Sequence, residues 1–126
     1  VYILDCVPNS SPEQVESRTA YFVEYLRKKH PHTPIIMIPT VVRELSFFNQ
    51  YWGERNRKQN EQWKAEYQKL IAKGVKHLYY LDDDYLLGHD HEGTTDGTHP
   101  NDLGFMRMAD KIEPFVLDVM RKHGLL

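Results

Sequence analysis

Ile35-Ile36-Met37-Ile38 is an unbroken apolar run that lies between two prolines. Successive side chains of a strand point to opposite faces, so a run without polar positions predicts a strand that is buried on both faces. Val1–Leu4 and Leu78–Leu81 are two more runs of this kind. Strands buried on both faces are typical of parallel sheets covered by helices. The three runs therefore predict the centre of an α/β domain.

The segment between the first two runs has the spacing of a helix. Its core-facing positions recur every three or four residues, namely Val15, Thr19, Phe22, Val23 and Leu26. Ser10, Ser11 and Pro12 are helix-start signals, and the cationic cluster Lys28-Lys29-His30 suits the last turn of a helix.

Two further helices follow. Before the third run lies an apolar stripe with helical spacing, which consists of Trp63, Tyr67, Leu70 and Ile71. It ends at Gly74, and glycine is favoured at helix ends. The mixed charges of Glu54–Lys69 predict a solvated face on this helix. After the third run comes a second stripe of Phe105, Met108, Ile112, Phe115, Val116 and Val119. We expect Pro114 to kink or divide this last helix.

Strands and helices therefore alternate along the chain, which predicts parallel strands with helices on both faces of the sheet. Ligands of such sheets bind beyond the carboxyl ends of the strands. The segments that leave those ends are Asp5–Asn9, Pro39–Arg43 and Asp82–His99. Functional residues are expected there.

Composition narrows the function. The 126 residues carry a formal net charge of −2, which argues against the strongly basic face of a nucleic-acid-binding protein. The chain has no apolar run near the roughly 20 residues of a membrane span. The single cysteine, Cys6, excludes an internal disulfide and a multi-cysteine zinc site. We expect one soluble domain, in a secreted or periplasmic location rather than in the cytoplasm.

The chain begins with Val1, inside the first apolar run, and not with methionine. Three strands also make a small sheet for an α/β domain. We therefore expect the sheet to be incomplete at the N-terminus, and residues 1–126 to be the C-terminal portion of a single domain.

A carboxylate and an imidazole lie three residues apart in Asp96-Gly97-Thr98-His99-Pro100-Asn101. Gly97 permits a tight turn, and Pro100 is favoured in the first turn of a helix. Such a turn can fold Asp96 back onto the His99 ring, which fixes one ring nitrogen as a donor and leaves the other free to take a proton. We interpret the pair as the acid and base of a hydrolytic triad. The alternative is a histidine that caps or packs at a helix start.

Asn9 is the second candidate, because it follows the first strand directly in Asp5-Cys6-Val7-Pro8-Asn9. Its side-chain amide can donate a hydrogen bond to the oxyanion of an acyl-transfer intermediate. The alternative is a turn residue, since asparagine between proline and serine is common in turns and helix caps.

Together these motifs resemble the SGNH hydrolases, also called the GDSL-like lipase/acylhydrolase family. Asp96–Asn101 is similar to that family's last block, in which Asp-x-x-His supplies the acid and base of a Ser-His-Asp triad. Asp5–Asn9 is similar to the block with the oxyanion asparagine, although it departs from the common Gly-x-Asn-Asp form. The resemblance implies a flavodoxin-like three-layer α/β/α fold and a cofactor-free acyl or acetyl esterase. It also implies a small-molecule or carbohydrate ester as the substrate.

The family's nucleophilic serine lies in a Gly-Asp-Ser block, which this chain lacks. Its serines, none of which has that setting or a Gly-x-Ser-x-Gly setting, are Ser10, Ser11, Ser17 and Ser46. The resemblance therefore implies a serine upstream of Val1, in the remainder of the hydrolase domain. We expect this chain alone to be inactive. In the complete enzyme His99 would be the base, Asp96 its orienting partner and Asn9 part of the oxyanion hole.

Other functions stay open at this point. A non-catalytic α/β domain that binds a ligand or a carbohydrate would keep the fold without the chemistry. A metal-dependent phosphoesterase would gather carboxylates and imidazoles from Asp82–His91 around a divalent ion, although that segment lacks a fixed ligand spacing. We interpret the segment instead as a solvated loop that forms one wall of the active-site cleft.

Two groups of residues after the second strand have two interpretations each. Arg43 either meets an anionic substrate group or forms a surface salt bridge. The aromatic residues beyond it either line an acyl or sugar pocket or pack against the protein, and they are Phe47, Phe48, Tyr51 and Trp52.

Overall fold

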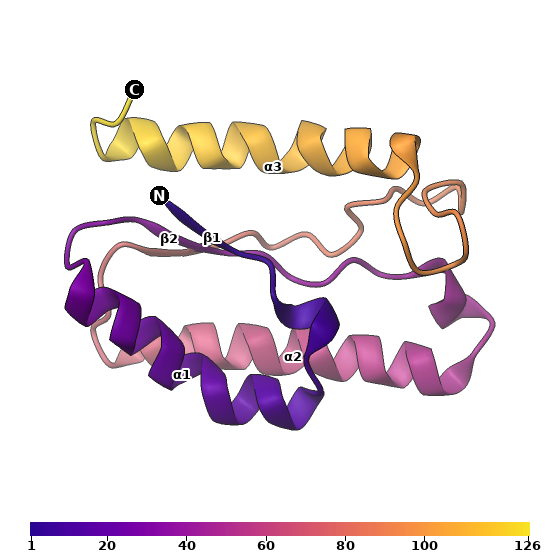
Figure 1. Ribbon diagram of the computed structural model, residues 1–126, viewed down its shortest axis with the longest axis horizontal. Coiled ribbons are helices and arrows are strands. Elements are labelled where there is room, and N and C mark those ends of the chain that lie inside the picture. Colours follow the sequence, from indigo (N-terminus) through magenta and orange to yellow (C-terminus); the bar gives the residue numbers. More distant parts are fainter.

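The computed structural model describes residues 1–126 and shows a sheet between two layers of helices (Figure 1). The strands are β1 (Tyr2–Leu4), β2 (Ile35–Met37) and β3 (Leu78–Tyr80). All pairings are parallel, in the order β1-β2-β3. The predicted strands, their parallel arrangement and the three-layer α/β/α architecture are confirmed.

The two faces of the sheet carry separate apolar clusters. Ile36 lies in register with Ile3 of β1 and Tyr79 of β3. Ile36 and Tyr79 belong to the cluster that packs under α3 (Asp102–Lys122). Met37, the next residue along β2, belongs to the cluster on the opposite face. This alternation shows why the β2 run has no polar position, since both of its faces are covered.

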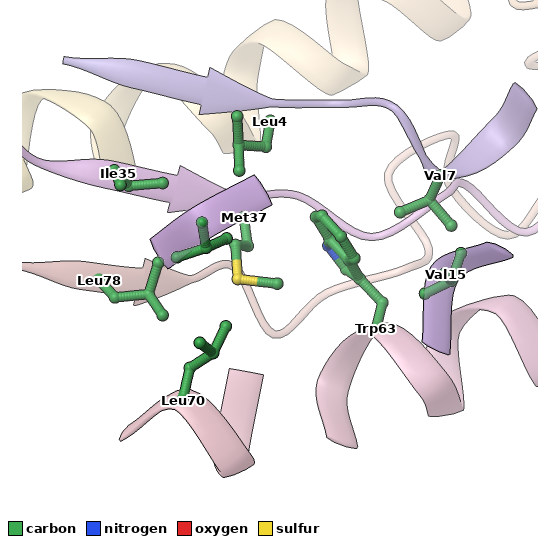
Figure 2. Packing of buried hydrophobic residues seen from close by; sticks show 9 residues of the cluster. Leu4, Val7, Val15, Ile35, Met37, Trp63, Leu70 and Leu78 are labelled. Carbon is green, nitrogen blue, oxygen red and sulfur yellow. The ribbon is translucent and has the colours of Figure 1, made fainter. Parts of the chain in front are cut away.

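The opposite face is covered by α1 (Pro12–Lys29) and α2 (Gln50–Ala72), which pack side by side (Figure 1). Figure 2 shows apolar side chains of these helices reaching towards the strands, with Met37 between Leu70 and Trp63 of α2. The core of this layer consists of Leu4, Val7, Val15, Val23, Ile35, Met37, Trp63, Leu70 and Leu78.

Capping residues explain where the first two helices begin. The Ser11 hydroxyl accepts the N–H of Gln14, whose side chain accepts the N–H of Ser11 in return, so α1 starts at Pro12 as predicted. The Asn49 side chain accepts the N–H of Trp52 and starts α2 one turn before the region where we expected a helix. The aromatic pair Tyr51-Trp52 is therefore helical.

Pro114 does not divide the last helix, because α3 continues through it to Lys122 (Figure 1). Pro114 and Asp110, four residues before it, are both on the exposed side of α3. Water can therefore bind the carbonyl group that the proline leaves without a partner.

The two edges of the sheet are covered to different extents. The cluster beneath α3 draws on β2, β3 and the segments that follow them, so α3 lies over that half of the sheet. Ile3 of β1 points to the same face but is 46% exposed. No helix is long and apolar enough to span a membrane.

Connections beyond the carboxyl ends of the strands converge at one end of the sheet. They include two short 3-10 helices, η1 (Val7–Asn9) and η2 (Glu44–Phe47), and the segment 81–101 before α3. The last of these segments contacts η2, because the N–H of Leu45 donates to the Gly97 carbonyl group at 2.8 Å. This end of the sheet holds the candidate site.

Candidate active site

The Asp96–His99 turn has the geometry that its sequence predicts. The Asp96 Oδ2 atom lies 2.7 Å from Nδ1 of His99. Oδ1 of the same carboxylate accepts the backbone N–H groups of Thr98 at 2.9 Å and His99 at 2.8 Å. Gly97 has a φ of 83°, which glycine adopts without strain. One carboxylate therefore holds both the backbone and the ring of His99.

These contacts determine the electrostatics of the pair. The N–H and ring contacts of His99, followed by the N–H of Thr98, hold the Asp96 pKa well below its usual range. An ionised carboxylate only accepts hydrogen bonds, so Nδ1 of His99 must be the donor. In the neutral ring Nε2 is then the acceptor. The His99 side chain is 78% exposed, so this nitrogen is accessible to a reacting group.

Asn101 joins the turn to α3. Its side-chain oxygen accepts the N–H of Gly104 at 2.9 Å, which caps the helix. Its side-chain amide donates to the carbonyl groups of Glu92 at 2.7 Å and Thr94 at 3.3 Å. A backbone bridge between Thr94 and Pro100 closes the turn between these contacts. His99 therefore lies on a loop that is fixed at both of its ends.

Close backbone contact explains the glycine three residues after the cap. A Cβ atom added at Gly104 would lie 2.1 Å from the Gly93 carbonyl oxygen. Only a residue without a side chain permits the first turn of α3 to approach the loop this closely. Gly104 thus sets the position of the helix against the Asp96–His99 turn.

Asn9 lies at the end of η1, in a turn held from α2. The Gln59 side chain donates to the carbonyl groups of Val7 at 2.9 Å and Ser10 at 2.6 Å. An Arg43 N–H group donates to the Pro8 carbonyl group at 3.0 Å. Asn9 is exposed. Asn9 therefore lies in a fixed turn, at the end of the sheet where His99 lies.

Asn9 and His99 line the same cavity, which has a volume of about 510 Å³. Its wall comes from all three connections and from the starts of α2 and α3. The lining residues are Asp5, Pro8, Asn9, Thr40, Val41, Arg43, Trp52, Arg55, Thr98, His99, Pro100, Phe105 and Met108. A volume of this size is within the range of sites for small ligands. The arrangement can hold a small substrate against an oriented base and an amide donor.

Comparison with known proteins shows the family of the chain. The sequence profile of the GDSL-like lipase/acylhydrolase family matches residues 1–117. The chain belongs to this family. A crystal structure of a Bacteroides ovatus protein assigned as a GDSL-like lipase is 50% identical and superposes with a TM-score of 0.93. The match covers 96% of this chain and 36% of that one. No curated protein matches the chain.

None of the serines in this GDSL-like family member lines the cavity. Each hydroxyl group has a local hydrogen-bond partner instead. The Ser10 hydroxyl donates to the Cys6 carbonyl group and that of Ser11 to the Glu13 carboxylate. The Ser17 hydroxyl donates to the Glu13 carbonyl group, and that of Ser46 to the Asn56 side chain.

The acidic segment does not form the wall that we predicted. Of the predicted Asp82–His99 connection, only Thr98 and His99 line the cavity. The carboxylates of Asp82 and Asp83 form ion pairs with lysines of α2 and α3. His91 lies 2.5 Å from the Glu44 carboxylate, so the segment 82–91 fastens the loop to the body of the protein. No group of three metal-ligating side chains is found.

The aromatic residues divide between the two interpretations. Trp52 lines the cavity, whereas Phe47, Phe48 and Tyr51 do not. Those three are exposed, and Phe47 lies with its ring 4.6 Å from that of His91. Arg43 forms no surface salt bridge, since it is buried and also lines the cavity.

Several residues that support the site escaped the sequence interpretation. The exposed face predicted in Glu54–Lys69 is present, but Asn56, Gln59 and Asn60 of the same stretch are buried. Asn60 pairs with both backbone groups of Thr40, and Asn56 accepts the N–H of Arg43. The sequence did contain a signal for these buried amides, because they lie three or four residues apart on the same helix face as Trp63 and Leu70. Buried side-chain amides at such positions need hydrogen-bond partners, and here they bond to backbone groups of the connections that follow the strands.

Proposed function

We propose that this chain supplies the base, its carboxylate partner and an oxyanion donor to a serine-type carboxylic ester hydrolase. The observation that carries the proposal is the Asp96–His99 contact of 2.7 Å at the rim of a cavity that Asn9 also lines. Membership of the GDSL-like lipase/acylhydrolase family supports hydrolysis in general. The ester class and the residue roles are our inference from the geometry.

The nucleophile in this proposal is a serine that precedes Val1. Two observations support it. The chain's own serines are bonded away from the cavity. The solved relative is covered over only 36% of its length, and Ile3 of the edge strand is exposed on the α3 face, where a further segment would pack. We therefore propose that residues 1–126 are the C-terminal portion of one hydrolase domain and are inactive alone.

The reaction follows from these roles. His99 takes the proton of the serine hydroxyl through Nε2 while that oxygen attacks the ester carbonyl carbon. Asp96 keeps Nδ1 protonated and stabilises the imidazolium ion that forms. Asn9 donates a hydrogen bond to the oxyanion of the tetrahedral intermediate. His99 then protonates the leaving alcohol, and it activates water to release the acid from the acyl-enzyme.

A fluorophosphonate probe tests this assignment, because such probes phosphonylate only an activated serine. The whole protein, meaning this chain with the segment that we propose before Val1, is treated with the probe and digested for mass spectrometry. We expect the adduct on a serine upstream of Val1, together with loss of p-nitrophenyl acetate hydrolysis. An adduct on Ser10 or Ser46 would place the nucleophile within this chain. Hydrolysis that resists the probe but stops with a chelator would instead indicate a metal-dependent esterase.

For the substrate we propose a class of ester, and for the location a compartment. Esters of short acyl groups, including acetyl esters of carbohydrates, fit a cavity of about 510 Å³. The secreted or periplasmic location is tested by fractionating cells that express the whole protein.

A further inference from the structure

Two arginines line the cavity on the side away from His99's own loop. Arg43 follows β2 and is only 6% exposed. Arg55 stands on α2 and is half-buried. Neither guanidinium group forms an ion pair, whereas the partly buried Arg107 pairs with Asp90.

Both guanidinium groups lie close to the indole ring of Trp52. The Cζ atom of Arg43 lies 5.7 Å from the ring centroid, and that of Arg55 lies 5.3 Å from it. Both distances are within the range of cation–π contacts. Each arginine is therefore fixed in position by an aromatic surface rather than by a counter-charge.

Most of the N–H groups of both arginines have no protein partner. Arg43 donates one hydrogen bond to the Pro8 carbonyl group, and Arg55 donates one to the Ser10 carbonyl group at 3.2 Å. A guanidinium group has five N–H donors. None of the remaining nitrogens of Arg43 is fully enclosed without a partner, so they are accessible from the cavity that the residue lines.

The charges around the pair leave an excess of positive charge. Burial lowers the Arg43 pKa, and the charge of Arg55 lowers it further. Asp5 is the one carboxylate that lines the cavity, and burial raises its pKa. Glu13 lies near Arg55 at the outer surface without forming an ion pair. An anion bound between the arginines would relieve their repulsion and use their free donors.

We propose that Arg43 and Arg55 bind an anionic group of the ester substrate against Trp52, while the ester bond lies between His99 and Asn9. The inference rests on the proposed ester hydrolysis and adds the substrate class, an ester that carries a carboxylate or a sulfate-like group. Arginine suits this role because its planar donors match two oxygens of such a group at once.

Two matched pairs of esters test the inference on the whole protein. In the first pair, p-nitrophenyl hydrogen glutarate and p-nitrophenyl pentanoate, the charge is in the acyl part. In the second pair, the acetyl esters of 4-hydroxybenzenesulfonate and 4-hydroxybenzenesulfonamide, the charge is in the alcohol part. We expect kcat/KM to favour the anionic ester at least roughly tenfold in one pair, which identifies the part that carries the charge.

Variants then assign the preference to the arginines. Arg55→Gln is expected to lower kcat/KM for the anionic ester roughly ten- to hundredfold and to leave the neutral ester nearly unchanged. Arg43→Gln is expected to lower kcat/KM for both esters, because Arg43 also holds the Pro8 carbonyl group of the Asn9 turn, but to lower it more for the anionic ester. Arg55→Gln keeps the test valid if the buried Arg43 variant does not fold. Arg57→Gln is the matched control, since Arg57 lies on the same helix and pairs with Glu61 in solvent.

Three results overturn the inference. Equal or weaker hydrolysis of the anionic member in both pairs shows that the arginines bind no substrate charge, and leaves ester hydrolysis itself standing. An equal loss on neutral and anionic esters in the arginine variants shows that they only position the Asn9 turn. If none of the four esters is hydrolysed, the proposed function fails and the inference fails with it.

Discussion

The Nδ1 atom of His99 lies 2.7 Å from Oδ2 of Asp96, and the backbone N–H of the same histidine donates to the other oxygen at 2.8 Å. The carboxylate therefore closes a small ring with the residue that it orients. Because both contacts arise within four residues, the pair needs little support from the rest of the fold. The remaining support comes from Asn101 and Gly104, which fix where α3 begins.

Asp96→Asn is expected to impair chemistry more than folding. The asparagine oxygen still accepts the backbone N–H groups, but its amide group would donate to Nδ1 and so favour the wrong tautomer of His99. We expect kcat of the whole protein on p-nitrophenyl acetate to fall roughly 10³- to 10⁴-fold, with a modest fall in Tm at neutral pH. Asp102→Asn, at the exposed first position of α3, is the control and keeps full activity. A small loss with Asp96→Asn would mean that the carboxylate is not the orienting partner.

The same carboxylate predicts a dependence of stability on pH. Its pKa in the folded chain is lower than the unfolded value of about 3.9, because the N–H and ring groups of His99 and the N–H of Thr98 bind the ionised form. The ionised carboxylate therefore stabilises the turn above that value, and this stability is lost as the pH falls through the folded pKa. We expect the Tm difference between wild type and Asp96→Asn to shrink between about pH 4 and pH 2. Calorimetry at several pH values measures it, and a difference that grows towards low pH contradicts the assignment.

Asn9→Ala is expected to remove an oxyanion donor while leaving the turn intact. The turn is held by Gln59 and Arg43 through backbone carbonyl groups, and the Asn9 side chain is not needed for it. Loss of one such donor lowers kcat roughly 10²- to 10³-fold. We expect KM and Tm to stay near their wild-type values. A change in Tm without a change in kcat would show that Asn9 is a turn residue only.

Gly104→Ala tests the close approach of α3 to the loop. Its Cβ atom would lie 2.1 Å from the Gly93 carbonyl oxygen, so the helix start must move away. We expect the free energy of unfolding to fall by roughly 1–3 kcal/mol, and activity to fall because the turn moves with the helix. Asp110→Ala on the exposed side of α3 is the control, with an expected change within about 0.5 kcal/mol. Denaturant titration that finds no destabilisation would contradict the packing.

The sheet and the Asp96–His99 turn were predictable because their causes are local. Apolar runs such as Ile35–Ile38 indicate strands buried on both faces, and an Asp-Gly-x-His sequence brings its own partners together. Family resemblance then placed Asn9 near His99, and the two residues line one cavity. Their catalytic roles stay predictions.

The rest of the site depends on contacts between distant segments, which no short motif contains. Arg55 and Gln59 lie in a stretch of mixed charge that resembles a solvated face, yet they bond to the turn that carries Asn9 from 45 or more residues away. The prediction for the acidic segment Asp82–His91 was wrong for the converse reason. Its carboxylates are adjacent in sequence but turn towards separate lysines, so proximity along the chain did not bring them together.

Replacement of His99 in the whole protein tests the central claim most directly. With His99→Ala, we expect kcat/KM for p-nitrophenyl acetate to fall by roughly 10³-fold or more and labelling by a fluorophosphonate to stop. His89→Gln, on the same loop but outside the cavity, should retain wild-type values. If His99→Ala hydrolyses the ester at the wild-type rate while folded, His99 is not the base of the proposed reaction and the account is wrong.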